Sequence, residues 1–377
     1  MGTTTRILSI GTVKIGGGLP VVLQSMTATK TTDIAKTADT CQRLADAGAG
    51  LVRVAVDTLR DAEALREIRR ILQGGRRGGH TAVNLSVDLQ ENYRLAEMVA
   101  PFVNKIRYNP GHLHHVEPET SWQTKVERMV EIARQHDCAL RIGVNCGSLD
   151  PHLNDGSSIE NAIMSALQHA AFIDSLGFDR FCVSIKSSDP KAVLFANRQF
   201  AAKRPDVPIH LGLTEAGLPP KGIEKSRAAL EPLLAEGIGD TLRVSLTVQN
   251  DRKTEEIDAG RFLLQNVAAG TILTDWQPES LNIISCPSCA RVENEQFVML
   301  AERVQEATRS MKETPLTIAV MGCRVNGPGE TDHADIGLWC GKTSVNLKRG
   351  STLIGSFSYE EVIEKMKLQI ALLVAER

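Results

Sequence analysis

Short β-rich runs alternate with amphipathic helical stretches over most of this 377-residue chain, and this alternation limits the folds it can adopt. The expected strands share β-branched or apolar residues at strand length: Val21–Thr27, Leu51–Val56, Ala82–Asp88, Lys105–Asn109, Leu140–Asn145, Phe181–Lys186, Ile209–Thr214 and Leu242–Thr247. Helical patterns such as Asp33–Ala47 and Glu119–Gln135 separate them. This order predicts right-handed βαβ units and a parallel sheet. Eight units in roughly 250 residues match a closed barrel. We therefore predict an α/β fold with a (β/α)8 TIM-type barrel over residues 1–270.

Two segments lie outside the repeating pattern. Ile7–Gly18 precedes the first unit and is expected to form a small hairpin that plugs the bottom of the barrel. After about residue 270 a Cys-rich turn is followed by a helical stretch, Asn294–Lys312, a strand, Leu316–Met321, two short strands and a last helix, Tyr359–Ala375. This change predicts a small α+β domain over residues 271–377.

Composition excludes several classes of function. A formal net charge of -2 gives no general attraction to nucleic acid or to an anionic membrane, and 4% aromatic residues are too few for base-stacking platforms. No apolar run approaches the roughly 18 residues that cross a bilayer. The start of the chain has no apolar signal-peptide core, so we expect a cytoplasmic protein. The eight cysteines of the chain are then expected to be reduced thiols or metal ligands.

Strand alternation predicts a charged barrel interior. Val52, Val54 and Val56 suit the helix-facing side of their strand, so Arg53 should point inward. The same alternation turns other polar side chains inward: Asn84, Ser86, Asp88, Lys105, Arg107, Asn109, Arg141, Asn145, Ser184, Lys186, His210, Thr214, Arg243, Ser245 and Thr247. Apolar side chains normally fill such a barrel. Internal salt bridges with Asp88, Glu215 and similar acidic residues are one interpretation. The inward carboxylates are too few for that, which favours a polyanionic ligand, most simply a diphosphate.

Cysteines near Gly and Pro indicate a metal centre in the last quarter of the chain. Cys286 and Cys289 form a Cys-x-x-Cys, and Cys323 follows at a distance. Soft thiolates select zinc or an iron–sulfur cluster. A structural zinc knuckle is the main alternative, but zinc normally takes four closed ligands and the obvious fourth thiolate is missing. Cys340 is a candidate fourth ligand from spacing alone.

The remaining candidate positions are less specific. Core packing is the better interpretation of Cys41, Cys138 and Cys182, whereas Cys146 follows a strand end and is expected near the site. His112, His114 and His115 form a short cluster in a loop. That cluster is either a second metal site or a solvated loop near the substrate.

The motifs resemble those of the GcpE (IspG) family, the bacterial 4-hydroxy-3-methylbut-2-enyl diphosphate synthases of the non-mevalonate isoprenoid pathway. The resemblance runs nearly end to end. It rests on Gln24–Thr27, Lys105–Gly111, Arg141–Asn145, His210–Gly217, Ser285–Arg291 and, most specifically, Met321–Glu330.

The resemblance implies a reaction and a cofactor. A [4Fe-4S] cluster would be held by Cys286, Cys289, Cys323 and Glu330, so that Glu330 rather than Cys340 becomes the fourth ligand. The substrate would be 2-C-methyl-D-erythritol 2,4-cyclodiphosphate, opened reductively and dehydrated to 4-hydroxy-3-methylbut-2-enyl diphosphate. Two electrons from flavodoxin or ferredoxin would pass through the cluster. The family also implies a homodimer in which the cluster domain of one subunit covers the barrel of the other.

The expected residue roles follow from this reaction. The diphosphate would be held by the inward cations and amides: Arg53, Arg107, Arg141, Lys186, Arg243, Asn109, Asn145 and Ser245. Glu215 is expected to protonate the departing oxygen, Glu330 to move aside, and His210 to position its neighbours.

The chain also departs from the family. Val248–Asp251 and His112–His115 replace an Asp-Pro turn and an Asn that many members carry. The competing hypotheses are an iron–sulfur electron carrier or redox sensor and a pterin-binding barrel. The first leaves the arginines unexplained, and the second needs no cysteine cluster.

Overall fold

Eight parallel strands form the barrel that the sequence predicts. The structure is a computed structural model that describes residues 4–75, 80–153, 157–274 and 280–376. The strands are β3 (Val22–Met26), β4 (Leu51–Ala55), β5 (Leu85–Gln90), β6 (Lys105–Tyr108), β7 (Ala139–Asn145), β8 (Phe181–Lys186), β9 (His210–Gly212) and β10 (Thr241–Arg243). Hydrogen-bonded neighbours run β8-β7-β6-β5-β4-β3-β10-β9. In the described residues an isolated parallel bridge, Val183 to Ile209, joins β8 to β9 and closes the ring.

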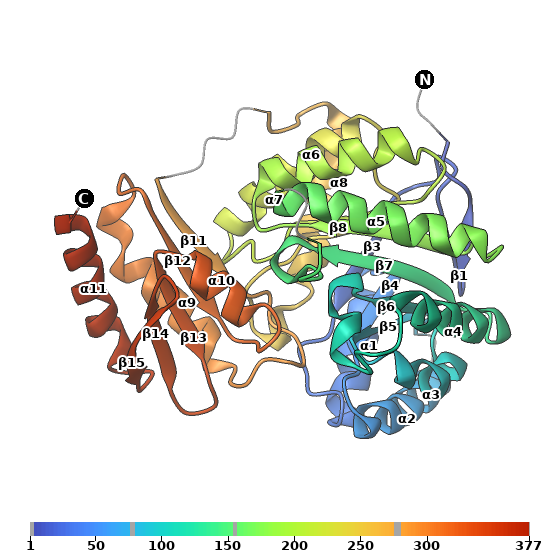
Figure 1. Ribbon diagram of the computed structural model, residues 1–377, viewed down its shortest axis with the longest axis horizontal. Helices are drawn as coiled ribbons and strands as arrows, with labels where there is room; N and C mark the ends of the chain where they lie inside the picture. The colour runs from blue at the N-terminus through green and yellow to red at the C-terminus, as the bar shows by residue number, and fades with distance from the viewer. Residues whose placement is uncertain (1–3, 76–79, 154–156, 275–279, 377) are drawn as a thin grey trace.

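Helices cover the outside of the barrel (Figure 1). They are α1 (Ile34–Asp46), α2 (Leu59–Gly75), α3 (Ala96–Val99), α4 (Trp122–Gln135), α5 (Ser158–Ser175), α6 (Pro190–Lys203), α7 (Lys221–Ala235) and α8 (Glu255–Ala269). Local sequence sets several of their starts. Ser121 caps α4, Ser157 and Glu160 form a capping box on α5, and Asp189 caps α6 with Pro190 at its first position. The apolar strand residues, such as Val52 and Val54, pack against these helices in one core.

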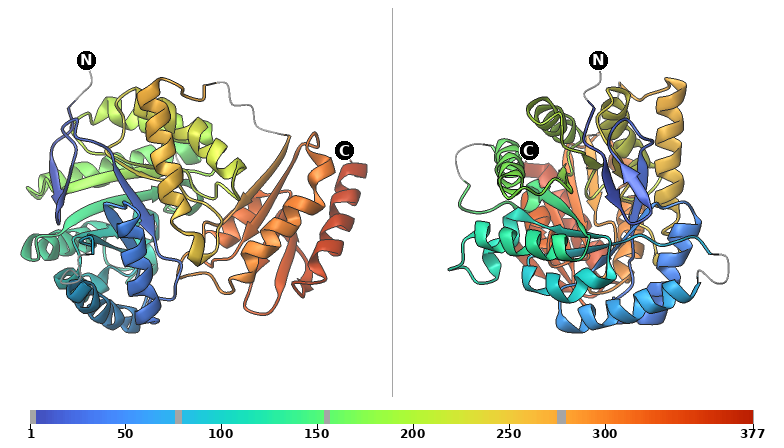
Figure 2. Two further views of the ribbon diagram at one scale, coloured as in Figure 1. Left: turned by 180° about the vertical axis from the view of Figure 1, so that it is seen from behind. Right: turned by 90° about the vertical axis from the view of Figure 1, so that its right-hand side faces the viewer.

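The N-terminal hairpin plugs the bottom of the barrel, as predicted. β1 (Leu8–Ile10) and β2 (Val13–Ile15) pair antiparallel. Leu8, Ile10 and Ile15 cluster with residues at the starts of barrel strands, among them Leu51 and Ala139. The hairpin lies at the end of the barrel away from the C-terminal part of the chain, as Figure 1 and the left view of Figure 2 show.

The C-terminal part is α+β, in agreement with the sequence. A sheet of order β11-β12-β13-β14-β15 is parallel over β11 (Leu281–Ser285), β12 (Leu316–Met321) and β13 (Ile336–Cys340), and antiparallel over β14 (Val345–Arg349) and β15 (Thr352–Phe357). Its helices are α9 (Gln296–Ala307), α10 (Gly327–His333) and α11 (Val362–Glu376). A second hydrophobic core lies here. The sequence interpretation missed β11 and one of the last three strands.

The described helices include none that is long and apolar enough to span a bilayer. The cytoplasmic location stays a prediction.

Candidate functional site

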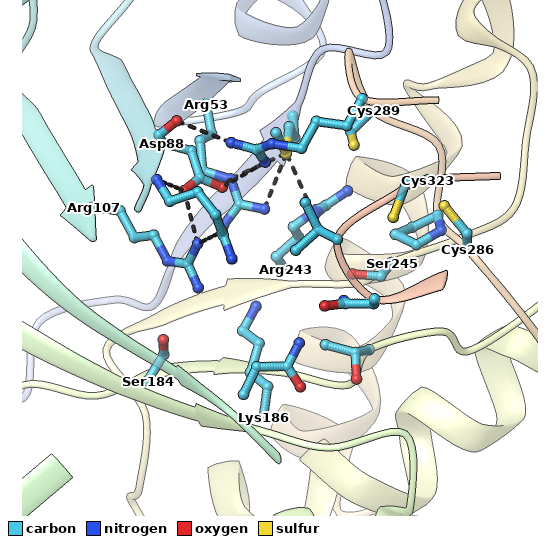
Figure 3. A pocket seen from close by; sticks show the side chains of 18 of the residues that line it. Arg53, Asp88, Arg107, Ser184, Lys186, Arg243, Ser245, Cys286, Cys289 and Cys323 are labelled. Carbon is cyan, nitrogen blue, oxygen red and sulfur yellow. Dashed lines mark hydrogen bonds and ion pairs between the residues drawn. The ribbon is translucent and has the colours of Figure 1, made fainter. Parts of the chain in front are cut away.

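A pocket lies between the carboxyl ends of the barrel strands and the cysteine-bearing loops of the same chain (Figure 3). Polar barrel residues make up most of its barrel side: Arg53, Asp88, Gln90, Arg107, Arg141, Asn145, Ser184, Lys186, Thr214, Glu215, Arg243 and Ser245. The C-terminal part contributes Cys286, Pro287, Cys289, Arg291, Cys323, Val325 and Asn326. The prediction that these side chains point into the barrel is therefore confirmed for most of the candidate residues.

Asp88 is the centre of a buried ion-pair network. Its carboxylate lies 2.8 Å from Arg107 Nη1 and 3.7 Å from Arg53 Nε. These guanidinium groups hold the pKa of Asp88 well below its ordinary value, against the opposing effect of burial. The inward Gly143 leaves the space that Arg107 crosses, because a Cβ there would collide with Nε of that arginine. The salt-bridge interpretation is therefore correct for these two arginines.

Arg141 and Lys186 are different, because no salt bridge to a carboxylate is found for either in the described part of the chain. Arg141 is 1% exposed, donates from Nη1 to Ser184 Oγ at 2.5 Å, and leaves its Nε and Nη2 without a partner. Burial, followed by the charge of Arg107, lowers the pKa of Arg141 to about 9. Burial and Arg141 likewise lower the pKa of Lys186. Internal salt bridges thus do not account for the whole cationic site, which leaves donors for an anion.

Arg243 has a partner that the sequence analysis missed. Glu256 on α8 is fully buried and lies 3.2 Å from Arg243 Nη2. Glu256 also accepts from Lys253 Nζ at 2.6 Å, from Ser25 Oγ at 2.7 Å and from the amide of Leu246 at 3.2 Å. Lys253 also donates to the carbonyl of Pro287 at 2.6 Å, which ties this network to the cysteine loop.

Parallel pairing brings the three cysteines together. Cys286 directly follows β11, Cys323 lies two residues beyond β12, and these strands are paired neighbours. Ser288 adopts a left-handed φ of 60°, which makes the tight turn between Cys286 and Cys289. Figure 3 shows the three thiols on one side of the pocket, opposite the labelled barrel cations.

The thiols are electrostatically coupled. The Cys286 thiol donates a hydrogen bond to Cys323, which lowers the pKa of Cys323 to about 7, and backbone amides at Asn326 and Val325 add to this. The same hydrogen bond raises the pKa of Cys286. A set of converging thiols with one easily ionised member suits an iron–sulfur cluster.

Two buried carboxyls lie beside the thiols. Burial, then the charges of Glu215 and Cys323, raises the pKa of Glu330 to about 8. Glu330 on α10 also accepts from Ser188 Oγ at 3.4 Å. Glu215 accepts from Asn326 Nδ2 at 3.0 Å, and burial raises its pKa too. Glu330 thus lies near enough to Cys323 for their charges to interact, but it is not among the residues that line the pocket. Its role as a metal ligand stays a prediction.

Other candidate residues lie away from the pocket wall. Cys340 is fully buried in the C-terminal core with its Sγ 3.8 Å from the carbonyl of Leu338. Asn109 donates to Ser148 Oγ at 2.9 Å and accepts from Gly111 N at 3.2 Å. His210 lies 3.2 Å from Lys186 Nζ and 2.6 Å from Thr241 Oγ1. Direct substrate contact by Asn109 or His210 stays a prediction.

Arg291 is another residue that the sequence analysis did not assign to the site, as are Gln90 and Asn326. It is nearly buried, with Nη2 2.7 Å from Asp57 Oδ1 and Nη1 3.4 Å from Asp88 Oδ2. The sequence could have indicated this role, because Arg291 ends the Ser285–Arg291 motif and lies two residues after Cys289. Lys30 supports the same loop by donating to the carbonyls of Ala290 and Val292 at 2.9 and 2.6 Å.

The barrel and the cysteine loops meet within one chain here. Thr247 Oγ1 donates to the carbonyl of Cys286 at 2.9 Å, and Ala216 forms a parallel β-bridge with Ser285. The sequence analysis expects this meeting across a dimer. The homodimer stays a prediction.

Comparisons with known proteins match both parts of the chain. A family model described as the GcpE TIM-barrel domain matches residues 5–261, and one described as the GcpE protein C-terminal domain matches residues 282–371. A relative from Rhodopirellula baltica, named 4-hydroxy-3-methylbut-2-en-1-yl diphosphate synthase (flavodoxin), is 53% identical over 99% of this chain and 97% of its own length. A protein of the same name from Nautilia profundicola is 39% identical over 96% of this chain and 95% of its own length.

A solved structure shares the barrel. Dihydropteroate synthase from Stenotrophomonas maltophilia aligns with a TM-score of 0.50 at 12% identity, covering 72% of this chain and 100% of its own. At that identity the likeness shows the fold alone.

Replacing Arg291 by Met should loosen the cysteine loop, because the substitution leaves two carboxylates without this partner. Breaking a buried ion pair costs about 3 kcal/mol or more, which corresponds to roughly 100-fold faster opening. Hydrogen exchange of the amides from 286 to 293 measures this. Arg309→Met is the matched control, since Arg309 is 76% exposed and its pair with Glu306 spans 3.6 Å. Equal exchange in the two variants would contradict the anchoring role.

Proposed function

This chain belongs to the GcpE family of 4-hydroxy-3-methylbut-2-en-1-yl diphosphate synthases, and from that membership we infer that it is an iron–sulfur oxidoreductase of isoprenoid biosynthesis. It opens the ring of 2-C-methyl-D-erythritol 2,4-cyclodiphosphate and dehydrates it to 4-hydroxy-3-methylbut-2-enyl diphosphate. The reaction takes up two electrons and two protons and releases one water. The observation that carries this inference is a pair of buried cations, Arg141 and Lys186, that have no carboxylate partner among the described residues and face a set of thiols across one pocket.

The electron donor that we propose is flavodoxin. The relatives from Rhodopirellula baltica and Nautilia profundicola both carry flavodoxin in their names. Ferredoxin is the other donor that the sequence analysis allows.

A [4Fe-4S] cluster is the cofactor that we propose, held by Cys286, Cys289, Cys323 and Glu330. The convergence of the thiols and the charge coupling of Glu330 to Cys323 support this ligand set. When bound, such a cluster supplies electrons one at a time and a Lewis-acidic iron. A carboxylate is a harder ligand than thiolate and is more easily displaced from iron.

The diphosphate is held by the cations around the barrel mouth. Arg141 and Lys186 offer donors that no carboxylate occupies among the described residues, and Arg53, Arg107 and Arg243 line the same pocket. Asn145 and Ser245 add polar contacts from the wall. Asp88 positions the guanidinium groups, because both of its oxygens already accept from arginines.

Glu215 is the proton donor to the departing oxygen. Burial keeps its carboxyl protonated at a pH where an exposed glutamate is ionised. It lines the same pocket as the cations and the thiols, so its proton is available where the C–O bond breaks. The hydrogen bond from Asn326 orients the acid.

Two features of organisation remain proposals. Separate hydrophobic cores support a division into residues 1–270 and 271–377. The family resemblance supports the head-to-tail homodimer, which sedimentation of the active enzyme measures directly.

An anaerobic assay of the reconstituted protein with the cyclodiphosphate and a strong one-electron reductant tests the function. We expect hydroxymethylbutenyl diphosphate as the product. Arg141→Met should lower kcat/KM by about 10- to 100-fold, the loss of one charge-assisted contact, and leave cluster reduction unchanged. No conversion by a fully loaded enzyme would favour the electron-carrier alternative.

Glu330→Cys tests the ligand assignment. The variant should keep a brown cluster absorbing near ~400 nm, because a thiolate is a good ligand, and turnover should collapse because that thiolate is not displaced. Cys340→Ser is the comparison and should retain both properties. Unimpaired turnover by Glu330→Cys would refute the displaceable carboxylate.

Glu215→Gln tests the proton donor. In the wild type kcat should fall as pH rises through the raised pKa of Glu215, because the ionised carboxylate has no proton to give. The variant should lose turnover by about 100-fold or more without that pH dependence, while its KM and cluster spectrum stay unchanged. A wild-type pH profile in the variant would assign the proton to another group.

A further inference from the structure

A histidine-rich turn at the rim of the barrel takes no part in the proposed function. The 3₁₀ helix Pro110–His115 follows β6 and carries His112, His114 and His115. Asn109 caps this helix by accepting from the amide of Gly111 at 3.2 Å. The cap connects the turn rigidly to the end of the strand.

The geometry of the 3₁₀ helix places two imidazoles on one face. Residues three apart eclipse each other in this helix, which has three residues per turn. His112 and His115 have that spacing, and their ring centroids lie 4.7 Å apart. An α-helix would displace the second ring around the axis, so the alignment depends on the 3₁₀ form.

A carboxylate from the neighbouring strand completes the group. Glu91 directly follows β5, which pairs in parallel with β6, so both strand ends reach the same rim. Glu91 Oε2 lies 2.7 Å from His115 Nδ1 and 3.8 Å from His112 Nδ1. One ligand atom from each of the three residues lies within 4.8 Å of the other two.

The group formed by Glu91, His112 and His115 has one nearly buried member and two members that solvent reaches. The His112 side chain is 12% exposed, whereas those of Glu91 and His115 are 39% and 44% exposed. A buried ligand fixes the position of an ion, and two half-exposed ligands leave a path by which it can enter. A simple Glu–His hydrogen bond explains the His115 contact but not the approach of His112.

We propose that Glu91, His112 and His115 form a binding site for a divalent transition-metal ion, with Zn²⁺ as the best-matched ion. Two imidazoles and one carboxylate form a known zinc set that leaves a fourth position for water. Imidazole nitrogen selects zinc and its neighbours over magnesium or calcium, which prefer all-oxygen sites. The site goes beyond the proposed function and does not depend on it.

The position of this site relates it to the pocket. Gln90 Nε2 lies 3.1 Å from His112 Nδ1, and the side-chain oxygen Oε1 of Gln90 accepts from Arg107 Nη1. A metal that takes Nδ1 of His112 releases the Gln90 amide group, whose other end holds a pocket arginine. Ion binding at the rim and anion binding at Arg107 therefore share one side chain.

Zinc titration of the cluster-loaded holoenzyme tests the proposal. One Zn²⁺ should bind, and zinc K-edge absorption should show only nitrogen and oxygen ligands at about 2.0–2.1 Å, without sulfur at about 2.3 Å. His112→Asn and His115→Asn should each weaken binding at least about 10-fold, since even loss of a ligand's supporting partner costs that much. Turnover is not needed for either readout.

His80→Asn is the matched control, because His80 also pairs with a carboxylate, Asp46, at 3.2 Å on the surface. It should leave zinc affinity unchanged. Sulfur ligands would place the ion at the cysteines, and wild-type affinity in both histidine variants would place it elsewhere. Either result overturns the proposal. If His112→Asn does not fold, the more exposed His115→Asn and Glu91→Gln carry the same test.

Discussion

Buried positive charge at the barrel mouth is the constraint on which the site depends. Taking a guanidinium or ammonium group out of water is costly unless an anion or carboxylate accompanies it. Asp88 and Glu256 meet this requirement for several arginines, whereas Arg141 and Lys186 have no carboxylate partner in the described part of the chain. The barrel interior therefore carries buried cations in place of the apolar packing that usually fills it, as the proposed anion site requires.

The thiol site depends on the same charges. The cysteine loops are attached to the barrel by Arg291, by Lys253 at the carbonyl of Pro287, and by Lys30 at two loop carbonyls. Each of these cations comes from one side of the interface and meets an acceptor on the other. The cysteine loops and the cationic barrel mouth are therefore joined by one set of polar contacts.

Periodicity explains what could be predicted from the sequence. Strand alternation assigns the side of the sheet correctly for Arg53 and Arg141, because successive side chains must point to opposite faces. Alternation does not predict how far along the barrel axis a side chain lies. His210, the first residue of β9, contacts Lys186 but is not among the residues that line the pocket. Glu256 was missed because an acid in the first turn of a helix looks like an ordinary surface residue. Its burial is decided by the packing of α8 on β10, which no local pattern encodes.

The closure of the barrel between β8 and β9 has a consequence for how the ligand and the fold interact. Among the described residues, the junction of β8 and β9 has a single isolated β-bridge and no regular ladder. β9 and β10, in contrast, pair over three residues. Lys186 ends β8 on one side of the junction, and Arg243 ends β10 beyond the other. A diphosphate bound by both Lys186 and Arg243 would link the strands on the two sides of this sparsely paired junction. Substrate occupancy and the opening of the barrel wall are then two aspects of one equilibrium, and the empty enzyme is the form in which that wall opens most readily.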